Sequence, residues 1–260
     1  MRLQAKRPVR VGTRLLGGPA VLTCVPLLPH DRKTLLDQAA RLGAMRPDCI
    51  EWRADHYHGL EPRDVPELVK LVAAAALCPL LITNRLQSEG GHAAQDEDRR
   101  LAILDAAVGT GVPAMVDIEM MTESRLAGPV IEAAHGAGVA VVRSWHDLSG
   151  TPSQQTALGA LRAMQDALAD VAKVVTTPVI PEDVLMLLGA GLLARRMFLE
   201  IPCVLMSMGP LGAVGRFGGH FGSDLTFAVG LEASAPGQMD LDLVRRVLVA
   251  LGLRAPAGEP

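Results

Sequence analysis

The stretch Val171-Ala172-Lys173-Val174-Val175-Thr176-Thr177-Pro178 decides how the rest of this sequence is interpreted. It is a short apolar run, rich in β-branched residues, with one lysine inside it and a proline at its end. Such a run is typical of a strand that is buried on both faces, as strands are in parallel sheets. We therefore predict a buried parallel strand over residues 171–176.

Lys173 is unusual in this chain, which has 21 arginines but four lysines. Lys6 lies in a basic N-terminal arm, and Lys33 and Lys70 lie in polar or helical stretches. Arginine keeps its proton in proteins, whereas a desolvated lysine can become a neutral, nucleophilic amine. Two interpretations stay open on this pattern alone: a lysine whose stem reaches out from a strand edge, and a lysine that forms Schiff bases.

Seven further apolar runs predict strands on either side of this one. The eight expected strands cover residues 20–25, 49–53, 80–84, 114–119, 139–144, 171–176, 202–207 and 224–229. Stretches with helical spacing, such as Leu35, Ala39 and Leu42, separate most of them. This alternation predicts an α/β fold, a closed parallel (β/α)8 TIM barrel. A doubly wound open sheet is the alternative, although no G-x-G-x-x-G motif follows the first run.

The two ends of the chain carry further predictions. We expect a short N-terminal β-hairpin over 9–16, and a last helix over 241–251 with Asp240 as its N-cap and Gly252 as its stop. The Pro/Gly/Ala-rich tail, 255–260, is expected to be frayed. A length of 260 residues suits one barrel domain spanning 1–260.

Composition excludes several classes of function. The net charge of −3 gives no basic field for nucleic acid or membranes, so an anionic substrate must be bound by local arginines. The four cysteines form no C-x-x-C pair and no His/Cys cluster, which predicts no metal site. Cysteines placed in apolar runs indicate reduced core thiols and a cytoplasmic protein. No apolar stretch is long enough to span a bilayer.

Polar residues fall at the carboxyl ends of the predicted strands, where barrel enzymes hold their active sites. Glu51 and Arg53 share one face of a strand because they are two positions apart, and so do Asp117 and Glu119. His146 follows the fifth run. Each feature alone also fits an internal ion pair or a structural histidine. Their gathering on one rim with a buried lysine favours a catalytic site.

The order of these motifs gives the sequence its resemblance to a known family. The motifs are Glu51-Trp52-Arg53-x-Asp55-His56, Thr83-x-Arg85 with Glu89-Gly90-Gly91, Asp117-x-Glu119, Ser144-x-His146-Asp147, Lys173, Met206-x-Met208-Gly209, Arg216, Phe221-Gly222-Ser223-x-x-Thr226-Phe227 and Ser234-Ala235-Pro236-Gly237-Gln238. Together they resemble the type I 3-dehydroquinate dehydratases, from about residue 21 to the last helix. Each motif is modest, but the ordered set is specific.

The resemblance implies a (β/α)8 barrel that dehydrates 3-dehydroquinate to 3-dehydroshikimate in the shikimate pathway of aromatic amino acid biosynthesis. It implies that Lys173 forms an imine with the substrate ketone and that His146 moves the protons, with Glu89 paired to His146. A protonated imine is an electron sink, which eases removal of the neighbouring proton. No cofactor is implied, and the family resemblance suggests a homodimer.

The resemblance also implies which residues bind the substrate. Glu51, Arg53 and Arg85 would contact the ring hydroxyls and order the pocket. Arg216 would bind the carboxylate, as a bidentate arginine does. Ser234 and Gln238 would assist from a loop that closes over the site.

Three positions depart from the family pattern. Leu148 stands where relatives often carry an aromatic residue, and Gly215 stands where a serine is usual. Pro26, which we expect to end the first strand, stands where some relatives have a serine. These departures put individual substrate contacts in doubt, while the residues for imine chemistry are all present.

Two other functions remain open from the sequence. A Schiff-base aldolase on the same barrel would need a Gly-rich phosphate site after the last strands. This chain has Ser-Ala-Pro-Gly-Gln there, which suits a carboxylate better. A non-catalytic barrel that senses a ring acid is the third hypothesis, and the combination of Lys173, His146 and Glu89 disfavours it.

Overall fold

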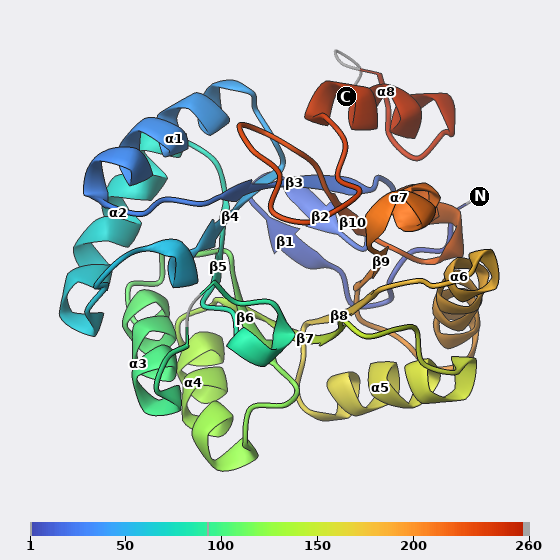
Figure 1. Ribbon diagram of the computed structural model, residues 1–260, viewed down its shortest axis with the longest axis horizontal. Helices are drawn as coiled ribbons and strands as arrows, with labels where there is room; N and C mark the ends of the chain where they lie inside the picture. The colour runs from blue at the N-terminus through green and yellow to red at the C-terminus, as the bar shows by residue number, and fades with distance from the viewer. Residues whose placement is uncertain (1, 93, 257–260) are drawn as a thin grey trace.

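The computed structural model describes residues 2–92 and 94–256, and a barrel of parallel strands forms its centre (Figure 1). In chain order the barrel strands are β3 (Leu22–Leu27), β4 (Cys49–Arg53), β5 (Leu80–Thr83), β6 (Met115–Glu119), β7 (Ala140–Asp147), β8 (Val171–Thr176), β9 (Cys203–Ser207) and β10 (Leu225–Phe227). Neighbours pair in parallel in the order β10-β3-β4-β5-β6-β7-β8-β9.

The two edges of this sheet meet and nearly close the barrel. A parallel bridge joins Cys203 to Ser223, and the Asp224 N–H donates to the Cys203 carbonyl at 2.7 Å. The predicted (β/α)8 barrel is confirmed, and the open sheet is excluded.

Helices surround the barrel on its outer side (Figure 1). The α-helices of the chain are α1 (Arg32–Ala44), α2 (Val65–Ala76), α3 (Glu97–Val108), α4 (Ser124–Gly136), α5 (Gln154–Asp166), α6 (Pro181–Met197), α7 (Gly209–Gly212) and α8 (Leu241–Ala250). The 3-10 helices are η1 (Ala54–His56), η2 (Pro62–Asp64), η3 (Gln87–Glu89), which carries a residue of the pocket described below, and η4 (Ala213–Phe221). The Asp240 carboxylate accepts from two N–H groups in the first turn of α8, so this predicted N-cap is confirmed.

Strand β8 shows why Lys173 faces the barrel interior. Side chains alternate between the two faces of a strand. Val171 and Val175 pack in the apolar cluster inside the barrel, whereas Ala172 and Val174 pack with residues of α5 and α6 outside it. Lys173 lies between the two inward valines, so its side chain points inward.

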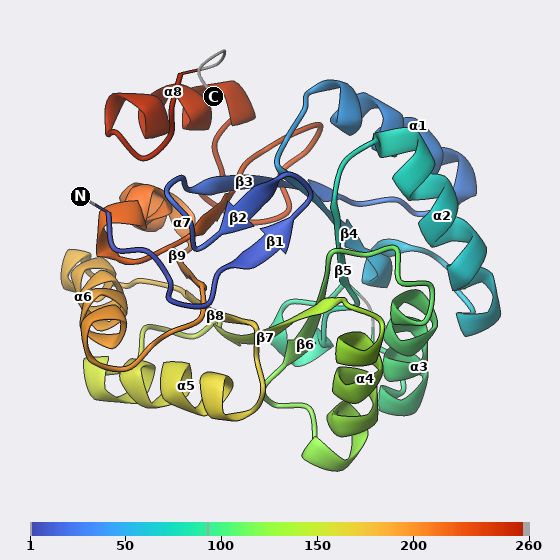
Figure 2. The same cartoon turned by 180° about the vertical axis from the view of Figure 1, so that it is seen from behind.

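The predicted hairpin is present and covers the amino ends of the strands. Strands β1 (Val9–Val11) and β2 (Arg14–Leu16) pair antiparallel, and they lie across the barrel in Figure 2. Val11 and Leu16 are buried in the same cluster as Val171, which closes this end of the barrel.

Some strand bounds differ from the prediction. β3 begins two residues later than expected, so Pro26 lies inside it, opposite Glu51, and the prediction that Pro26 ends the strand is wrong. Proline has no backbone N–H to donate, and the hydrophobic pattern alone does not show that the strand continues past Pro26. β7 extends to Asp147, which puts His146 on a strand, opposite Val175.

Two observations concern the ends of the chain and membranes. Residues 257–260 of the tail expected to be frayed lie outside the described residues, and the prediction of one domain over 1–260 stays a prediction. Within 2–92 and 94–256, every helix is too short or too polar to cross a bilayer.

Candidate active site

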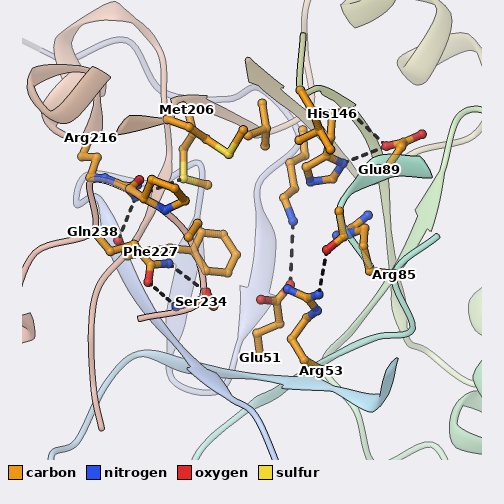
Figure 3. Close-up of a pocket in the computed structure, with 17 residues that line it drawn as sticks. Glu51, Arg53, Arg85, Glu89, His146, Met206, Arg216, Phe227, Ser234 and Gln238 are labelled. Carbon is orange, nitrogen blue, oxygen red and sulfur yellow. Dashed lines mark hydrogen bonds and ion pairs between the residues drawn. The ribbon is translucent and has the colours of Figure 1, made fainter. Parts of the chain in front are cut away.

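A pocket opens at the carboxyl ends of the barrel strands and contains all nine predicted site residues (Figure 3). Its volume is about 260 Å³. The residues around it are Glu51, Arg53, Arg85, Glu89, Gly90, His146, Leu148, Lys173, Val175, Met206, Met208, Arg216, Phe227, Ser234, Ala235, Pro236 and Gln238. The structure therefore brings the predicted residues together, while their individual roles stay predictions.

Lys173 lies at the base of the pocket and is 4% exposed. Its Nζ atom donates to Asp117 Oδ2 at 2.9 Å and lies 3.7 Å from Glu51 Oε1. The Phe227 ring is 5.0 Å from the same nitrogen. Two carboxylates and one aromatic face therefore surround the amine, which the pocket leaves open on its remaining side.

Asp117 is the carboxylate closest to this amine, and it is fully buried. Burial raises the pKa of its carboxyl, but the positive charges of Arg85 and Lys173 outweigh this and hold the pKa well below its usual range. Asp117 is therefore ionised at neutral pH, and its negative charge lies beside Lys173.

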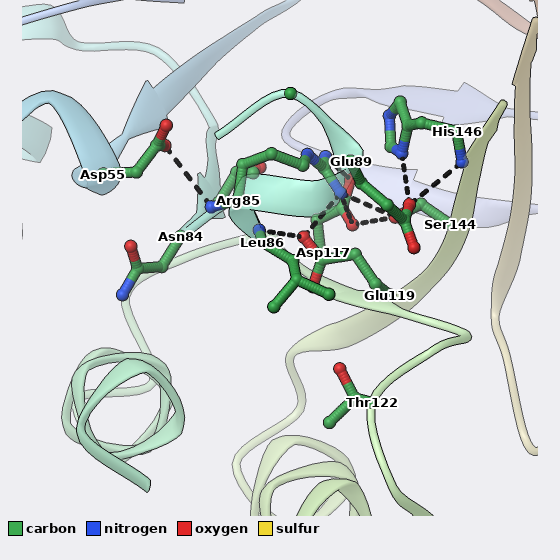
Figure 4. A network of polar contacts seen from close by, with 12 residues as sticks. Asp55, Asn84, Arg85, Leu86, Glu89, Asp117, Glu119, Thr122, Ser144 and His146 are labelled. Carbon is green, nitrogen blue, oxygen red and sulfur yellow. Dashed lines mark hydrogen bonds and ion pairs between the residues drawn. The ribbon is translucent and has the colours of Figure 1, made fainter. Parts of the chain in front are cut away.

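Arg85 connects Asp117 to the neighbouring strands (Figure 4). Its guanidinium donates to Asp117 at 2.7 and 3.1 Å, to Glu119 at 2.8 Å and to the Ser144 hydroxyl at 2.8 Å. Glu119 in turn accepts from Arg100 of α3 at 2.7 Å. Buried charges need such partners because an unpaired charge in the interior is costly. The network fixes the position of Asp117 and hence the surroundings of Lys173.

His146 is held by Glu89. Glu89 Oε2 accepts from the His146 backbone N–H at 2.9 Å and lies 2.8 Å from His146 Nδ1 (Figure 4). Burial, and then the charge of Glu119, raises the pKa of Glu89 to about 7. Burial, and then the charges of Arg85 and Lys173, holds the pKa of His146 well below its usual range. His146 is therefore a neutral imidazole at pH 7, the form that accepts a proton.

Glu51 and Arg53 are anchored by their neighbours on the pocket floor. Glu51 Oε1 accepts from the Thr83 hydroxyl at 2.9 Å. Arg53 donates two bonds to Asp55, at 2.8 and 2.6 Å. Asp55 also accepts the His92 N–H at 2.9 Å, so it links this strand to the loop that carries Glu89.

Arg216 differs from the other pocket arginines because, among the described residues, it pairs with no carboxylate. Its guanidinium donates to three backbone carbonyls, those of Gly237 at 2.6 Å, Pro236 at 3.0 Å and Phe227 at 3.3 Å. Burial lowers the pKa of Arg216 to about 10. A buried cation without a counter-charge is suited to bind the carboxylate of a ligand.

The loop with Ser234 and Gln238 forms one wall of the pocket (Figure 3). The two residues hydrogen-bond each other: Ser234 N–H donates to Gln238 Oε1 at 2.9 Å, and Gln238 Nε2 donates to Ser234 Oγ at 3.0 Å. Gly237 between them has a φ of +76°, and a Cβ there would lie 2.2 Å from the Gly209 carbonyl oxygen. The loop thus packs closely against Gly209, the first residue of α7.

Two of the three departures lie away from the pocket. Leu148 lines it and is 43% exposed. Gly215 and Pro26 do not line it; a Cβ on Gly215 would lie 3.8 Å from Ser207 Oγ. A Cβ at position 215 would thus point toward Val184 and Ser207.

The sequence interpretation missed that Asp117 contacts Lys173, and it assigned no role to Phe227 or Met206. The period-two spacing of Asp117 and Glu119 placed both on one face, but spacing cannot show which cation each one meets. Within the described ranges, no group of His, Cys, Asp and Glu side chains is arranged to hold a metal ion.

Comparisons with known proteins show which proteins this chain is similar to. Residues 23–254 match the family model of type I 3-dehydroquinase. Two proteins called 3-dehydroquinate dehydratase are similar: one from Klebsiella pneumoniae strain 342, 36% identical over 87% of this chain and 92% of its own length, and one from Albidiferax ferrireducens, 37% identical over 95% of both chains. The crystal structure of 3-dehydroquinate dehydratase from Geobacillus kaustophilus superposes with a TM-score of 0.92, at 35% identity, over 98% of this chain and 100% of its own.

Proposed function

This chain belongs to the type I 3-dehydroquinase family, whose members are hydro-lyases, and on that premise we propose that it dehydrates 3-dehydroquinate to 3-dehydroshikimate through an imine on Lys173. The observation that carries the proposal is the buried amine of Lys173 in one pocket with the neutral imidazole of His146. A catalyst that forms an imine and moves a neighbouring proton needs these two groups together.

The first step is imine formation. The Lys173 amine, once it has lost a proton, adds to the ring ketone, and the resulting carbinolamine loses its oxygen as water. The protonated imine keeps a positive charge on the nitrogen, and the carboxylate of Asp117 stabilises it there. Glu51 adds a second negative charge on the same side of the nitrogen.

The second step is proton removal beside the imine carbon. His146 takes this proton on Nε2, and the electron pair left behind moves into the imine, which becomes an enamine. The enamine electrons then move back: the C=N bond re-forms, a C=C bond forms between the carbon that lost its proton and the next ring carbon, and the hydroxyl on that next carbon leaves. His146 donates its proton to the departing hydroxyl. Water finally hydrolyses the imine and releases the enone and Lys173. The net change is the loss of one water.

Binding and orientation come from the other residues. Arg216 binds the substrate carboxylate, and Ser234 and Gln238 exchange their mutual hydrogen bonds for bonds to it. Arg53, Arg85 and Glu51 contact the ring hydroxyls. Their fixed partners hold them in place before the substrate arrives, which lowers the cost of binding.

We further propose a role in the shikimate pathway, a cytoplasmic location and a homodimer. Four free cysteines support the location. Exposed apolar side chains on adjacent elements support the dimer: Val179, Ile180 and Leu185 at the start of α6, and Val214 in η4. Sedimentation analysis that finds a monomer at micromolar concentration would remove the dimer from this proposal.

The chemistry is tested by trapping the imine. Borohydride added with 3-dehydroquinate reduces the C=N bond and should leave the ligand attached to Lys173, as found by peptide mass analysis. His146→Ala should still form this adduct but lose most of its turnover, measured by the absorbance of the enone. If the adduct forms at another residue, or if an active enzyme forms no adduct, the proposal is wrong.

A further inference from the structure

A groove lined with arginines lies at the amino ends of the strands, at the other end of the barrel from the active site. Its volume is about 690 Å³. Arg14 comes from the hairpin that covers this end, and Arg46 precedes β4 by a few residues. We call this feature the arginine groove, and its arginines are Arg14, Arg46, Arg245, Arg246 and Arg254.

Few carboxylates balance these charges. Asp48 forms an ion pair with Arg14 at 3.1 Å and accepts a hydrogen bond from Arg254 at 3.0 Å. Arg245 donates to the carbonyl oxygens of Met45 and Arg46. It also lies 3.4 Å from the exposed Asp242.

Arg46 and Arg246 are exposed, and neither pairs with a carboxylate among the described residues. The arginine groove is therefore strongly positive, although the chain as a whole carries a net charge of −3. Gathering like charges is unfavourable without a counter-ion.

We propose that the arginine groove binds a small polyanion with two or more adjacent phosphoryl groups. Guanidinium groups match phosphoryl oxygens in bidentate geometry, and several such groups at one place bind adjacent phosphoryl groups better than a single anion. Met45 and Val249 line the same groove and give it an apolar wall. A confined depression with such a wall suits a small molecule, whereas a nucleic acid surface would be an extended basic stripe.

Binding here joins three separate parts of the chain: the hairpin, the loop after α1, and α8 with the segment that follows it. A ligand that binds only the folded protein raises its melting temperature as the ligand concentration rises. The arginine groove is remote from Lys173, so the dehydration rate should change little when it is filled.

Inorganic tripolyphosphate is the probe for the test, and titration calorimetry is the measurement. Wild-type protein should bind it at one site, with an affinity that falls as salt is raised. Arg46→Ala/Arg246→Ala should weaken binding at least tenfold. The matched control, Arg63→Ala/Arg125→Ala, removes the same charge from exposed positions elsewhere and should bind as wild type does.

Circular dichroism checks that each variant is folded. Should Arg46→Ala disturb the turn after α1, Arg246→Glu alone carries the test, because Arg246 lies on the exposed face of α8. No saturable binding by the wild type overturns the proposal. An equal loss in the groove variant and the control also overturns it, and so does tighter binding of an RNA oligomer or of phosphatidylglycerol vesicles.

Discussion

The Nζ atom of Lys173 lies 2.9 Å from Oδ2 of Asp117, and the two residues stand on strands β8 and β6 on either side of β7. The same carboxylate binds Arg85. One buried anion is thus shared by the proposed nucleophile and by a pocket arginine. The carboxylate is therefore in place to stabilise the positive charge of a protonated imine on the lysine nitrogen.

Asp117→Asn tests this relationship. Losing the anion removes the stabilisation of the protonated imine, so kcat should fall at least tenfold, about 1.4 kcal/mol or more. It also leaves Arg85 with one carboxylate fewer, and breaking a buried ion pair costs about 3–5 kcal/mol of stability. Steady-state kinetics and chemical denaturation measure the two effects.

Glu119→Gln is the matched control, because Glu119 pairs with Arg85 and Arg100 and makes no contact with Lys173. It should lower stability by a similar amount but reduce kcat less than Asp117→Asn does. Equal losses of kcat in both variants would mean that Asp117 acts through Arg85 and not on the lysine nitrogen.

The pair of Glu89 and His146 predicts how activity depends on pH. The pKa of Glu89 is raised to about 7 and that of His146 is well below its usual range, so both groups are neutral below pH 7. Above pH 7, Glu89 is ionised and accepts a hydrogen bond from Nδ1–H of His146, which leaves Nε2 unprotonated as the base. The kcat/KM should therefore rise as pH increases through about 7 and then level off.

Glu89→Gln removes the group that titrates, so the rise near pH 7 should disappear. The rate at pH 8 should fall by roughly tenfold, because the amide no longer supplies a charged acceptor for imidazole. A profile from pH 5.5 to 9 measures this. If the variant keeps the same rise, another group is responsible for it.

Arg216 should bind substrate at a cost to stability. Arg216→Met removes a buried cation that has no carboxylate partner among the described residues, so the melting temperature should stay the same or rise. Without the cation, the substrate carboxylate has no counter-charge. The kcat/KM should therefore fall roughly 30-fold or more, mainly through a higher KM, which corresponds to a loss of about 2 kcal/mol of transition-state stabilisation.

The exposed Arg63 provides the control, since Arg63→Met should change neither quantity. Kinetics and a thermal melt are needed together. A variant of Arg216 that loses stability while keeping its KM would show that the guanidinium serves the loop and not the substrate.

Much of the barrel could be predicted from the sequence because its parallel strands are short, apolar and separated by helical patterns. The bounds of β3 and β7 were less accurate. Hydrophobic runs do not show that a strand continues through Pro26, or through polar residues as far as Asp147, since these positions are set by pairing with β4 and β8.

The order of the motifs predicted the nine site residues. The strand periodicity predicted that they lie together at the carboxyl ends of the barrel strands. The partners of each charge depend on three-dimensional distances. The sequence therefore could not show that Arg85 has two carboxylate partners whereas Arg216 has none in the described part of the chain. It also could not show that Ser234 and Gln238 bind each other before any ligand does.

Gly237 should be needed for the loop that forms one wall of the pocket. At a φ of +76° an alanine is strained, and its Cβ would also lie 2.2 Å from the Gly209 carbonyl oxygen. Gly237→Ala should therefore push the loop away from Gly209 and break the contacts of Arg216 with Pro236 and Gly237. We expect kcat/KM to fall at least tenfold.

Gly59→Ala separates the two causes. Gly59 has a φ of +64°, and apart from its chain neighbours no atom of the described residues lies within 4 Å of the added Cβ. That variant carries the backbone strain alone, about 1 kcal/mol, and should keep its kcat/KM. If Gly237→Ala loses stability to the same extent as Gly59→Ala and remains fully active, the close packing of this loop is not required for substrate binding.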